Sequence, residues 1–172
     1  MSVDVYFGLG SNHTPEAQLR LAHRELTLLC GPLTSSPAYR NPAVGCDGAD
    51  FLNMVVQGTT TLDPASLLAE LERIHRLAGR RREAPEPGVW VLDIDLLLYG
   101  DAVSQQWKVP RPDILCHAFA ARPMADIAPQ LRHPVSQQTM AEIWAGLSPN
   151  ADAMSPVSLD FLSAEPLAQG IL

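Results

Sequence analysis

The sequence predicts a single globular domain that contains both α-helices and β-strands. The chain has 172 residues, of which 47% are hydrophobic and 18% are charged, and this composition is typical of a folded domain with a sizeable core. Apolar residues alternate in some segments and recur at helical spacing in others. No internal repeat divides the chain, so we expect one domain over residues 1–172, with a loosely packed C-terminal tail from about residue 148.

The first elements expected are a strand and a helix. Apolar residues alternate over Val3–Leu9, which predicts a strand. Thr14 and Pro15 are the residue types preferred at an N-cap and at the first helical position. Leucines and an alanine continue from there at helical spacing, and Gly31 with Pro32 predicts the end of the helix.

Two further strands and a second helix are expected next. Leu33–Tyr39 has the pattern of a strand interrupted by a proline, and Phe51–Thr61 that of a clear strand with an amide, Asn53, among its apolar residues. An amide at that position needs hydrogen-bond partners, which are either a group in a neighbouring loop or the edge of a heterocyclic ligand. Asp63 and the proline after it predict a helix that ends at Gly79.

The stretch Val89–Tyr99 is apolar and rich in β-branched residues, which predicts a strand buried on both faces. Because side chains alternate along a strand, Asp93 and Asp95 lie on the same face. Two buried carboxylates need a compensating cation, and Mg²⁺ held by one or two carboxylates normally completes its coordination with water and substrate phosphates. The alternatives are aspartates that face water at a strand end, or that pair with arginines.

A charged loop at residues 79–88 leads into this strand and contains three consecutive arginines, Arg80, Arg81 and Arg82. Their guanidinium groups are either solvated or reach a phosphate held beside the aspartates. Further along, Asp113 is expected to cap a helix that runs through Ala121. Residues 124–129 are expected to link onward to a last short helix over residues 138–147.

Composition also limits the classes of function. Cys30, Cys46 and Cys116 are widely spaced, which argues against a disulfide framework and against a thiolate zinc site. A formal net charge of −7 argues against nucleic-acid partners and against anionic membranes. No apolar run is long enough to cross a bilayer and the N-terminus lacks a signal-peptide pattern, so the expected compartment is the cytoplasm. The oligomeric state is not predicted.

Several motifs, taken together in their order and spacing, resemble the 6-hydroxymethyl-7,8-dihydropterin pyrophosphokinase family of folate biosynthesis. The likeness extends from about Val3 to about Leu131. Its motifs are Gly8-Leu9-Gly10-Ser11-Asn12, Tyr39-Arg40-Asn41-Pro42, Asp50-Phe51-Leu52-Asn53, Gly79-Arg80-Arg81-Arg82, Leu92-Asp93-Ile94-Asp95, Val109-Pro110, Phe119 and Ile127-Ala128-Pro129.

The resemblance implies a fold and a reaction. The fold is a ferredoxin-like α+β sandwich, in which helices cover an antiparallel sheet. The reaction transfers a diphosphoryl group from ATP, the co-substrate, to the hydroxymethyl oxygen of the pterin and releases AMP. Two Mg²⁺ ions are expected on Asp93 and Asp95, and ATP and the pterin are the only partners implied.

The resemblance also assigns residues to the two substrates. Phe51 and Phe119 match an aromatic pair that sandwiches the pterin, and Asn53 matches the amide that reads the pterin edge. Arg80 and Arg82 match catalytic arginines. The pterin-pocket loop matches Asn41, Pro42 and Val44, and the expected nucleotide-binding residues are Glu72, His75, Arg82, Arg111 and His117.

The chain departs from the family pattern on the nucleotide side. Trp90 stands where the family has an arginine that contacts the nucleotide phosphates, and Arg111 replaces a histidine. His75 replaces a residue that is usually acidic.

Three functions are therefore weighed. The first is a pyrophosphokinase of this family, and the second is a catalytically weakened or inactive paralogue that binds a pterin or a protein partner. The third is a metal-dependent phosphatase or glycosyltransferase that uses the Asp-x-Asp motif, but it explains neither Asn53 with its aromatic neighbours nor the arginine loop.

Overall fold

The computed structural model describes residues 1–43, 47–81, 86–151 and 154–163. Its elements are, in chain order, β1 (Val3–Ser11), α1 (Pro15–Cys30), β2 (Thr34–Ser35), β3 (Ala38–Asn41), β4 (Phe51–Thr60), α2 (Pro64–Leu77), β5 (Asp93–Tyr99), α3 (Asp113–Cys116), α4 (Ala118–Ile127), α5 (Met140–Leu147), a 3-10 helix (Ser148–Asn150), β6 (Ser155–Val157) and α6 (Asp160–Ser163). No helix among these described residues is long and apolar enough to cross a membrane.

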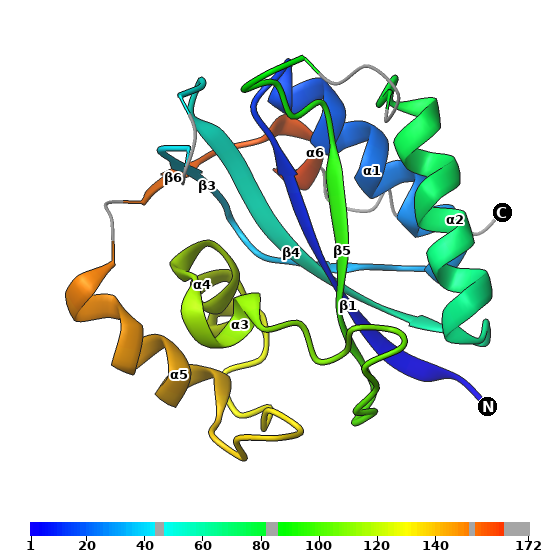
Figure 1. The fold of residues 1–172 in the computed structure, drawn as a ribbon, viewed down its shortest axis with the longest axis vertical. Coiled ribbons are helices and arrows are strands. Elements are labelled where there is room, and N and C mark those ends of the chain that lie inside the picture. Colours follow the sequence, from blue (N-terminus) through cyan, green and yellow to red (C-terminus); the bar gives the residue numbers. More distant parts are fainter. Residues whose placement is uncertain (44–46, 82–85, 152–153, 164–172) are drawn as a thin grey trace, which may run out of the picture.

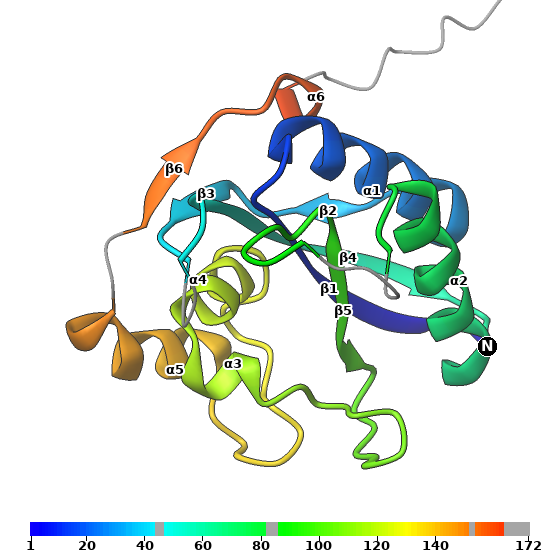
Figure 2. The same ribbon diagram turned by 45° about the horizontal axis from the view of Figure 1, so that its top comes forward.

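The strands form one antiparallel sheet in the order β5-β1-β4-β3-β6, with β2 paired to β4 (Figure 1). Helices α1 and α2 lie on one side of this sheet, and α3, α4 and α5 lie on the other (Figure 2). The expected α+β ferredoxin-like sandwich, an antiparallel sheet covered by helices, is confirmed.

Each face of the sheet has its own hydrophobic cluster. Phe7 and Leu9 of β1 are fully buried with the apolar stripes of α1 and α2. Val55 of β4 and Leu97 of β5 are buried with the short helices α3, α4 and α5. Alternate residues of one strand thus pack in two separate hydrophobic clusters, because successive strand side chains point to opposite faces.

The starts of the two long helices differ in how they are capped. Asp63 caps α2 as predicted, since its Oδ1 accepts a hydrogen bond from the N–H of Ser66 at 2.9 Å. Pro15 is the first residue of α1, but the predicted cap by Thr14 is wrong, because Thr14 has left-handed backbone angles (φ 44°, ψ 52°) and its side chain accepts no capping hydrogen bond. A capping residue normally has extended angles, which direct its side chain over the first turn.

The strand that carries the two aspartates begins at Asp93 and not at the predicted Val89. The backbone of Trp90 bonds instead to Asn12, in the loop after β1, and the hydroxyl of Ser11 donates to the carbonyl of Val91 at 2.6 Å. β5 is an edge strand that pairs with β1. Ile94, Leu96, Leu97 and Leu98 are nevertheless buried and point to both faces, as predicted, whereas Asp93 and Asp95 are only partly buried.

The C-terminal half contains more helix than predicted. The helix expected from Asp113 through Ala121 is two helices, α3 and α4, because His117 between them has extended backbone angles (φ −126°, ψ 125°). Asp113 is the first residue of α3, whose N-cap position is Pro112. The link expected at residues 124–129 is helical as far as Ile127.

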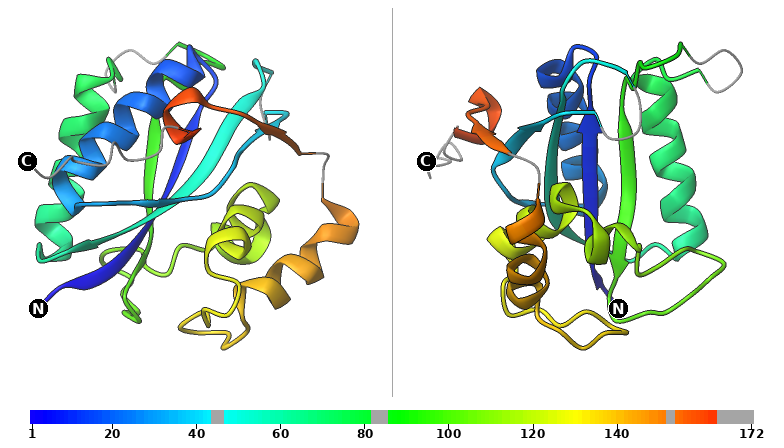
Figure 3. Two further views of the ribbon diagram at one scale, coloured as in Figure 1. Left: turned by 180° about the vertical axis from the view of Figure 1, so that it is seen from behind. Right: turned by 60° about the vertical axis from the view of Figure 1, so that its left-hand side comes forward.

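Part of the segment expected to pack loosely joins the sheet. β6 pairs with β3, and Leu159 is 3% exposed. The carbonyl of Met154 accepts a hydrogen bond from Arg122 of α4 at 3.2 Å. Figure 3, in its view from behind, shows α6 lying over α1, where the ring of Phe161 lies 5.3 Å from that of His23. The described residues 154–163 are therefore attached to the sheet and to α1 and α4 by specific contacts.

Candidate active site

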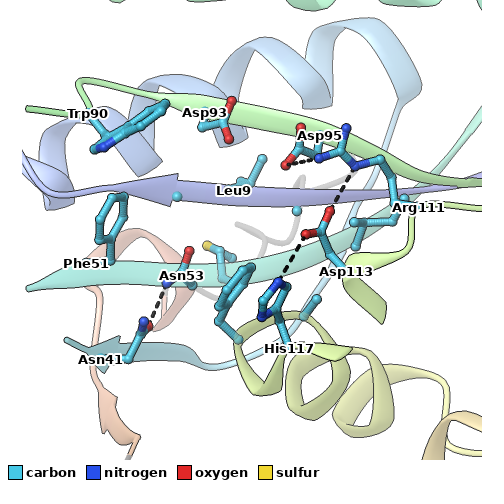
Figure 4. Close-up of a pocket in the computed structure, with 16 residues that line it drawn as sticks. Leu9, Asn41, Phe51, Asn53, Trp90, Asp93, Asp95, Arg111, Asp113 and His117 are labelled. Atoms are coloured by element: carbon cyan, nitrogen blue, oxygen red, sulfur yellow. Dashed lines mark hydrogen bonds and ion pairs between the residues drawn. The ribbon is translucent and has the colours of Figure 1, made fainter. Parts of the chain in front are cut away.

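A cavity of about 380 Å³ opens beside β5, β1 and β4, on the side of the sheet that carries α3 and α4. Figure 4 shows the side chains that line it. The cavity residues named by the sequence prediction are Asn41, Phe51, Asn53, Asp93, Asp95, Arg111, His117 and Phe119, and Trp90 lies at its edge. The structure therefore brings together residues that are up to 78 positions apart, from Asn41 to Phe119.

Asn53 and Asn41 form the polar part of one end of the cavity. The amide nitrogen of Asn53 lies 2.6 Å from Oδ1 of Asn41 and donates to it, and Nδ2 of Asn41 donates to the carbonyl of Pro42 at 3.2 Å. The partner of Asn53 is thus a protein group, as in the first of the two alternatives, but Asn41 is the last residue of strand β3 and not part of a loop as expected. This bond orients the Asn53 amide so that its oxygen points across β1 toward Gly10.

Aromatic rings stand at both ends of the same cavity. Phe51 extends from β4 near Trp90 (Figure 4), a residue that is 44% exposed. At the other end the ring of Phe119 stacks on that of His117, with centroids 4.9 Å apart and planes at 11°. The walls of the cavity therefore suit a flat heteroaromatic molecule, which stacks on ring faces.

Asp93 and Asp95 point toward the cavity, and each has an arginine partner. Nη1 of Arg80 lies 3.1 Å from Asp93, and Nη2 of Arg111 lies 3.5 Å from Asp95. Arg111 also donates through Nε to Asp113 at 2.9 Å. The pairing with arginines that the sequence left open is therefore present, and it leaves both aspartates about one third exposed (36% and 31%).

The charge at Asp95 is only partly compensated by these arginines. Burial, together with the neighbouring charge of Asp93, raises the pKa of Asp95 to about 6, against the opposing effect of Arg111. A carboxylate with a raised pKa prefers to be neutral unless more positive charge is supplied. The site therefore favours an added cation.

A second cavity of about 420 Å³ lies on the other side of the aspartates, between α2, β5 and the turn that follows β5. It is lined by Glu72, His75 and Arg80, and it shares Asp93, Asp95 and Arg111 with the first cavity. The acidic pair consequently lies at the border between an aromatic cavity and a charged one.

The two carboxylates suit a hard cation that takes only one or two of its ligands from the protein. Within the described ranges no group of three or more His, Cys, Asp or Glu side chains is placed to hold a metal ion. Mg²⁺, however, is commonly bound through one or two carboxylates and takes its other ligands from water and phosphate. The donor set of Asp93 and Asp95, in which the pKa of Asp95 is raised, fits such an ion.

The remaining predicted site residues that the structure describes lie at or near the two cavities, and His75 lines the charged one. The side chain of His75 is 5% exposed, and both ring nitrogens are engaged, Nε2 by the N–H of Ile94 and Nδ1 by Glu72. His117 lines the aromatic cavity. Pro42 is exposed next to Asn41. The predicted residues Val44 and Arg82 lie outside the described residues.

The sequence prediction assigned no role to Asn12, which is 9% exposed and joins three loops beside the aromatic cavity. Its Nδ2 donates to the carbonyls of Gly88 at 2.8 Å and Ala49 at 3.3 Å, and its Oδ1 accepts from the N–H of Trp90 at 2.6 Å. An asparagine directly after a strand suggests a turn, and only the contacts reveal this role. Trp107 and Lys108, in the turn that lines the charged cavity, were also missed.

We expect Gly10→Ala to weaken binding of a flat ligand in the aromatic cavity at least about tenfold, while leaving the fold intact. A Cβ at Gly10 would lie 2.7 Å from Oδ1 of Asn53, so the amide has to turn away. Gly8→Ala is the matched control, because a Cβ there meets Leu97 at an ordinary 3.5 Å. A fluorescence titration with a dihydropterin, the flat ligand that the family resemblance implies, checks this, and equal affinities for the two variants would contradict it.

Known proteins resemble this chain over most of its length. A family model described as 7,8-dihydro-6-hydroxymethylpterin-pyrophosphokinase (HPPK) matches residues 6–129. Three relatives are named 2-amino-4-hydroxy-6-hydroxymethyldihydropteridine pyrophosphokinase. That of Haemophilus influenzae is 36% identical over 141 residues (78% of this chain and 88% of the relative), that of Aquifex aeolicus 32% over 142 residues (80% and 88%), and that of Pseudomonas aeruginosa 36% over 138 residues (76% and 83%).

Solved structures share the fold at low sequence identity. The wild-type HPPK-DHPS of Plasmodium falciparum matches with a TM-score of 0.66 at 13% identity, over 85% of this chain and 45% of that chain. The same wild-type protein with pteroate matches with a TM-score of 0.67 at 12% identity, over 85% and 44%. This chain thus spans less than half the length of those solved chains, and at this identity the likeness concerns the fold alone.

Proposed function

Because the chain belongs to the 7,8-dihydro-6-hydroxymethylpterin-pyrophosphokinase family, we propose that it transfers the terminal diphosphoryl group of ATP to the hydroxymethyl oxygen of 6-hydroxymethyl-7,8-dihydropterin and releases AMP. This reaction belongs to folate biosynthesis. The observation that carries the proposal is the position of Asp93 and Asp95 at the border between an aromatic cavity and a charged one. Transfer of a diphosphoryl group requires the two substrate sites to meet, and these two cavities meet at the aspartates.

The aromatic cavity is the proposed pterin site. Phe51 and Phe119 provide ring faces for the flat pterin, and the amide of Asn53, held by Asn41, provides hydrogen-bonding groups for its edge. An amide of fixed orientation that a ligand covers discriminates strongly against ligands that lack the matching group, because the covered polar group is then left unpaired. We assign the choice of pterin over other flat molecules to this pair of amides, with Pro42 and Val44 added on the family resemblance alone.

The charged cavity is the proposed nucleotide site. Arg80, Arg111 and Lys108 supply positive charge on its walls, and Glu72 supplies an acceptor. Arg80 contacts Asp93 and Arg111 contacts Asp95, so their guanidinium groups also lie within reach of phosphate held beside the carboxylates. His117 is assigned to the pterin side through its stack on Phe119, and Arg82 to the phosphates on the resemblance alone.

Asp93 and Asp95 would hold Mg²⁺, with two ions expected from the family resemblance. When bound, Mg²⁺ neutralises the charge that develops on the phosphate oxygens and orients the polyphosphate. The raised pKa of Asp95 supports this assignment, because the carboxylate gains most from a nearby positive charge.

The proposed step is an in-line displacement at the β-phosphorus of ATP. The hydroxymethyl oxygen of the pterin forms a bond to this phosphorus, while the bond to the oxygen that bridges to the α-phosphorus breaks. AMP leaves with that oxygen, and the hydroxyl proton passes to water. Phe51 and Phe119 hold the acceptor in place, and Arg80 and Arg111 stabilise negative charge on the transferring group, so positioning and electrostatics supply the rate enhancement.

A pterin-binding paralogue without turnover is the second candidate function. The observation that favours it is Trp90, which stands at the cavity edge where the family has a phosphate-binding arginine. Losing one charge-assisted contact to the transferring group costs a few kcal/mol in the transition state. Arg111 is placed to supply part of the missing charge, since it already contacts Asp95.

One experiment separates these candidates. Purified protein is incubated with Mg-ATP and the pterin, AMP and the pterin diphosphate are quantified by chromatography, and pterin binding is titrated on the same preparation. We expect equimolar AMP and pterin diphosphate, with no AMP when the pterin is omitted. Pterin binding without AMP release would establish the second candidate. The absence of both pterin binding and AMP release would refute both candidates.

A further inference from the structure

His75 of α2 holds the strand that carries the aspartates. Its Nε2 lies 2.9 Å from the backbone nitrogen of Ile94 and accepts a hydrogen bond from it, and both residues are buried, at 4% and 3% exposure. Ile94 is the residue between Asp93 and Asp95. The contact thus fixes the backbone at the midpoint of the acidic pair.

The position of β5 in the sheet explains why this bond matters. β5 is an edge strand, so alternate backbone N–H groups point away from β1, and that of Ile94 is one of them. An unpaired, buried N–H is costly and leaves the end of an edge strand free to twist or fray. The side chain of His75, from α2, accepts the hydrogen bond of this N–H in place of a neighbouring strand.

The protonation of the ring suits this role. Because Nε2 accepts from a backbone N–H, the ring proton resides on Nδ1, which lies 3.3 Å from Oε1 of Glu72 and donates to it. Burial, with the nearby charge of Arg80, lowers the pKa of His75, so the neutral ring is favoured. Both ring nitrogens are then bonded within the protein. The ring therefore has no donor or acceptor left for a direct hydrogen bond to a nucleotide.

We propose that His75 is a positioning residue, which sets the spacing and direction of Asp93 and Asp95 by holding the amide of Ile94. The inference rests on the proposed function for its effect on turnover, but the bond itself is independent of any reaction. It also replaces the nucleotide-contact role expected for His75 from the family resemblance.

The test compares His75→Leu, which removes the acceptor while keeping an apolar side chain, with His75→Gln, whose amide oxygen reaches a similar place. Arg76→Leu, on the exposed face of the same helix turn, is the matched control. Amide hydrogen exchange of Ile94 is followed by NMR, with Met54 in the central strand β4 as the reference amide. Mg²⁺ binding is titrated by calorimetry, and kcat and KM are measured for AMP release.

We expect His75→Leu to speed exchange at Ile94 at least about tenfold with Met54 unchanged, to weaken Mg²⁺ binding and to lower kcat about 10- to 100-fold, while KM for the pterin stays the same. His75→Gln should restore most of each property, and Arg76→Leu should match the wild type. Wild-type exchange and Mg²⁺ binding in His75→Leu would overturn the inference, as would a rise confined to KM for ATP. If wild-type protein releases no AMP, the proposed function fails, and the exchange and Mg²⁺ measurements still decide the role of His75.

Discussion

Asp95→Asn is expected to reduce AMP release at least about 10³-fold and, at the same time, to stabilise the metal-free protein at pH 7.5. The loss of activity follows because one of the two carboxylates that border both cavities loses its charge, and electrostatic stabilisation of the transferring group is commonly the largest catalytic contribution. Pterin binding should change little, because Phe51, Asn53 and Phe119 lie toward the aromatic side.

The gain in stability follows from the raised pKa of Asp95. Its pKa is about 6 in the folded protein against the ordinary aspartate value of 3.8, so between these values the folded state binds more protons than the unfolded state. Stability contributed by this group is therefore present below pH 3.8 and is lost as the pH rises through about 6. Asparagine carries no charge, so the variant escapes this loss. We expect a gain of about 1–2 kcal/mol at pH 7.5, reduced by the partial exposure of the side chain.

Urea denaturation in the presence of EDTA, at pH 7.5 and at pH 4, checks this expectation. The gain should be present at the higher pH and nearly absent at the lower one. Asp101→Asn, at an exposed position in the turn after β5, is the matched control and should shift neither stability nor activity. Full AMP release by Asp95→Asn would exclude the metal assignment, and a pH-independent gain would exclude the electrostatic explanation.

The second large effect is expected for Asn12→Ala, which should destabilise the protein by about 2–3 kcal/mol and raise KM for the pterin about tenfold or more. The side chain bonds to Ala49, Gly88 and Trp90, which are 37, 76 and 78 residues away. Its removal leaves partly buried backbone groups of two loops without this partner. Trp90 and Phe51, which lie at the ends of these two loops, line the aromatic cavity, so the position of Trp90 becomes variable and pterin binding weakens.

The close approach of these loops strengthens this expectation. A Cβ at Gly48 would lie 2.7 Å from the carbonyl of Gly88, and a Cβ at Gly88 would lie 2.5 Å from that of Asp47, so the two backbones nearly touch. Thermal denaturation and steady-state kinetics of Asn12→Ala, with the exposed neighbour His13→Ala as control, measure both effects. A destabilised variant with unchanged KM would separate the structural role of Asn12 from any role at the cavity.

Much of the fold follows from local sequence patterns. Alternation over Val3–Leu9 and Phe51–Thr61 predicted β1 and β4, and Asp63 predicted the start of α2, because these signals act over a few residues. The errors occur where distant contacts override local preference. Thr14 has left-handed backbone angles close to Asn12, which bonds to Trp90. Because of that bond, residues 89–92 do not join β5 as predicted.

The sequence by itself determined the chemical parts of this protein: the paired aspartates on one strand face, the amide of Asn53 within an apolar strand, and the arginine-rich loop. Only the tertiary structure decided how these parts are held, through Asn12 across three loops, His75 on the amide of Ile94, and Arg111 between Asp95 and Asp113. The physical reason is range. Periodicity and capping are set by neighbours within one or two turns, whereas a buried hydrogen bond is set by whichever residue the packing of the whole sheet brings within about 3 Å.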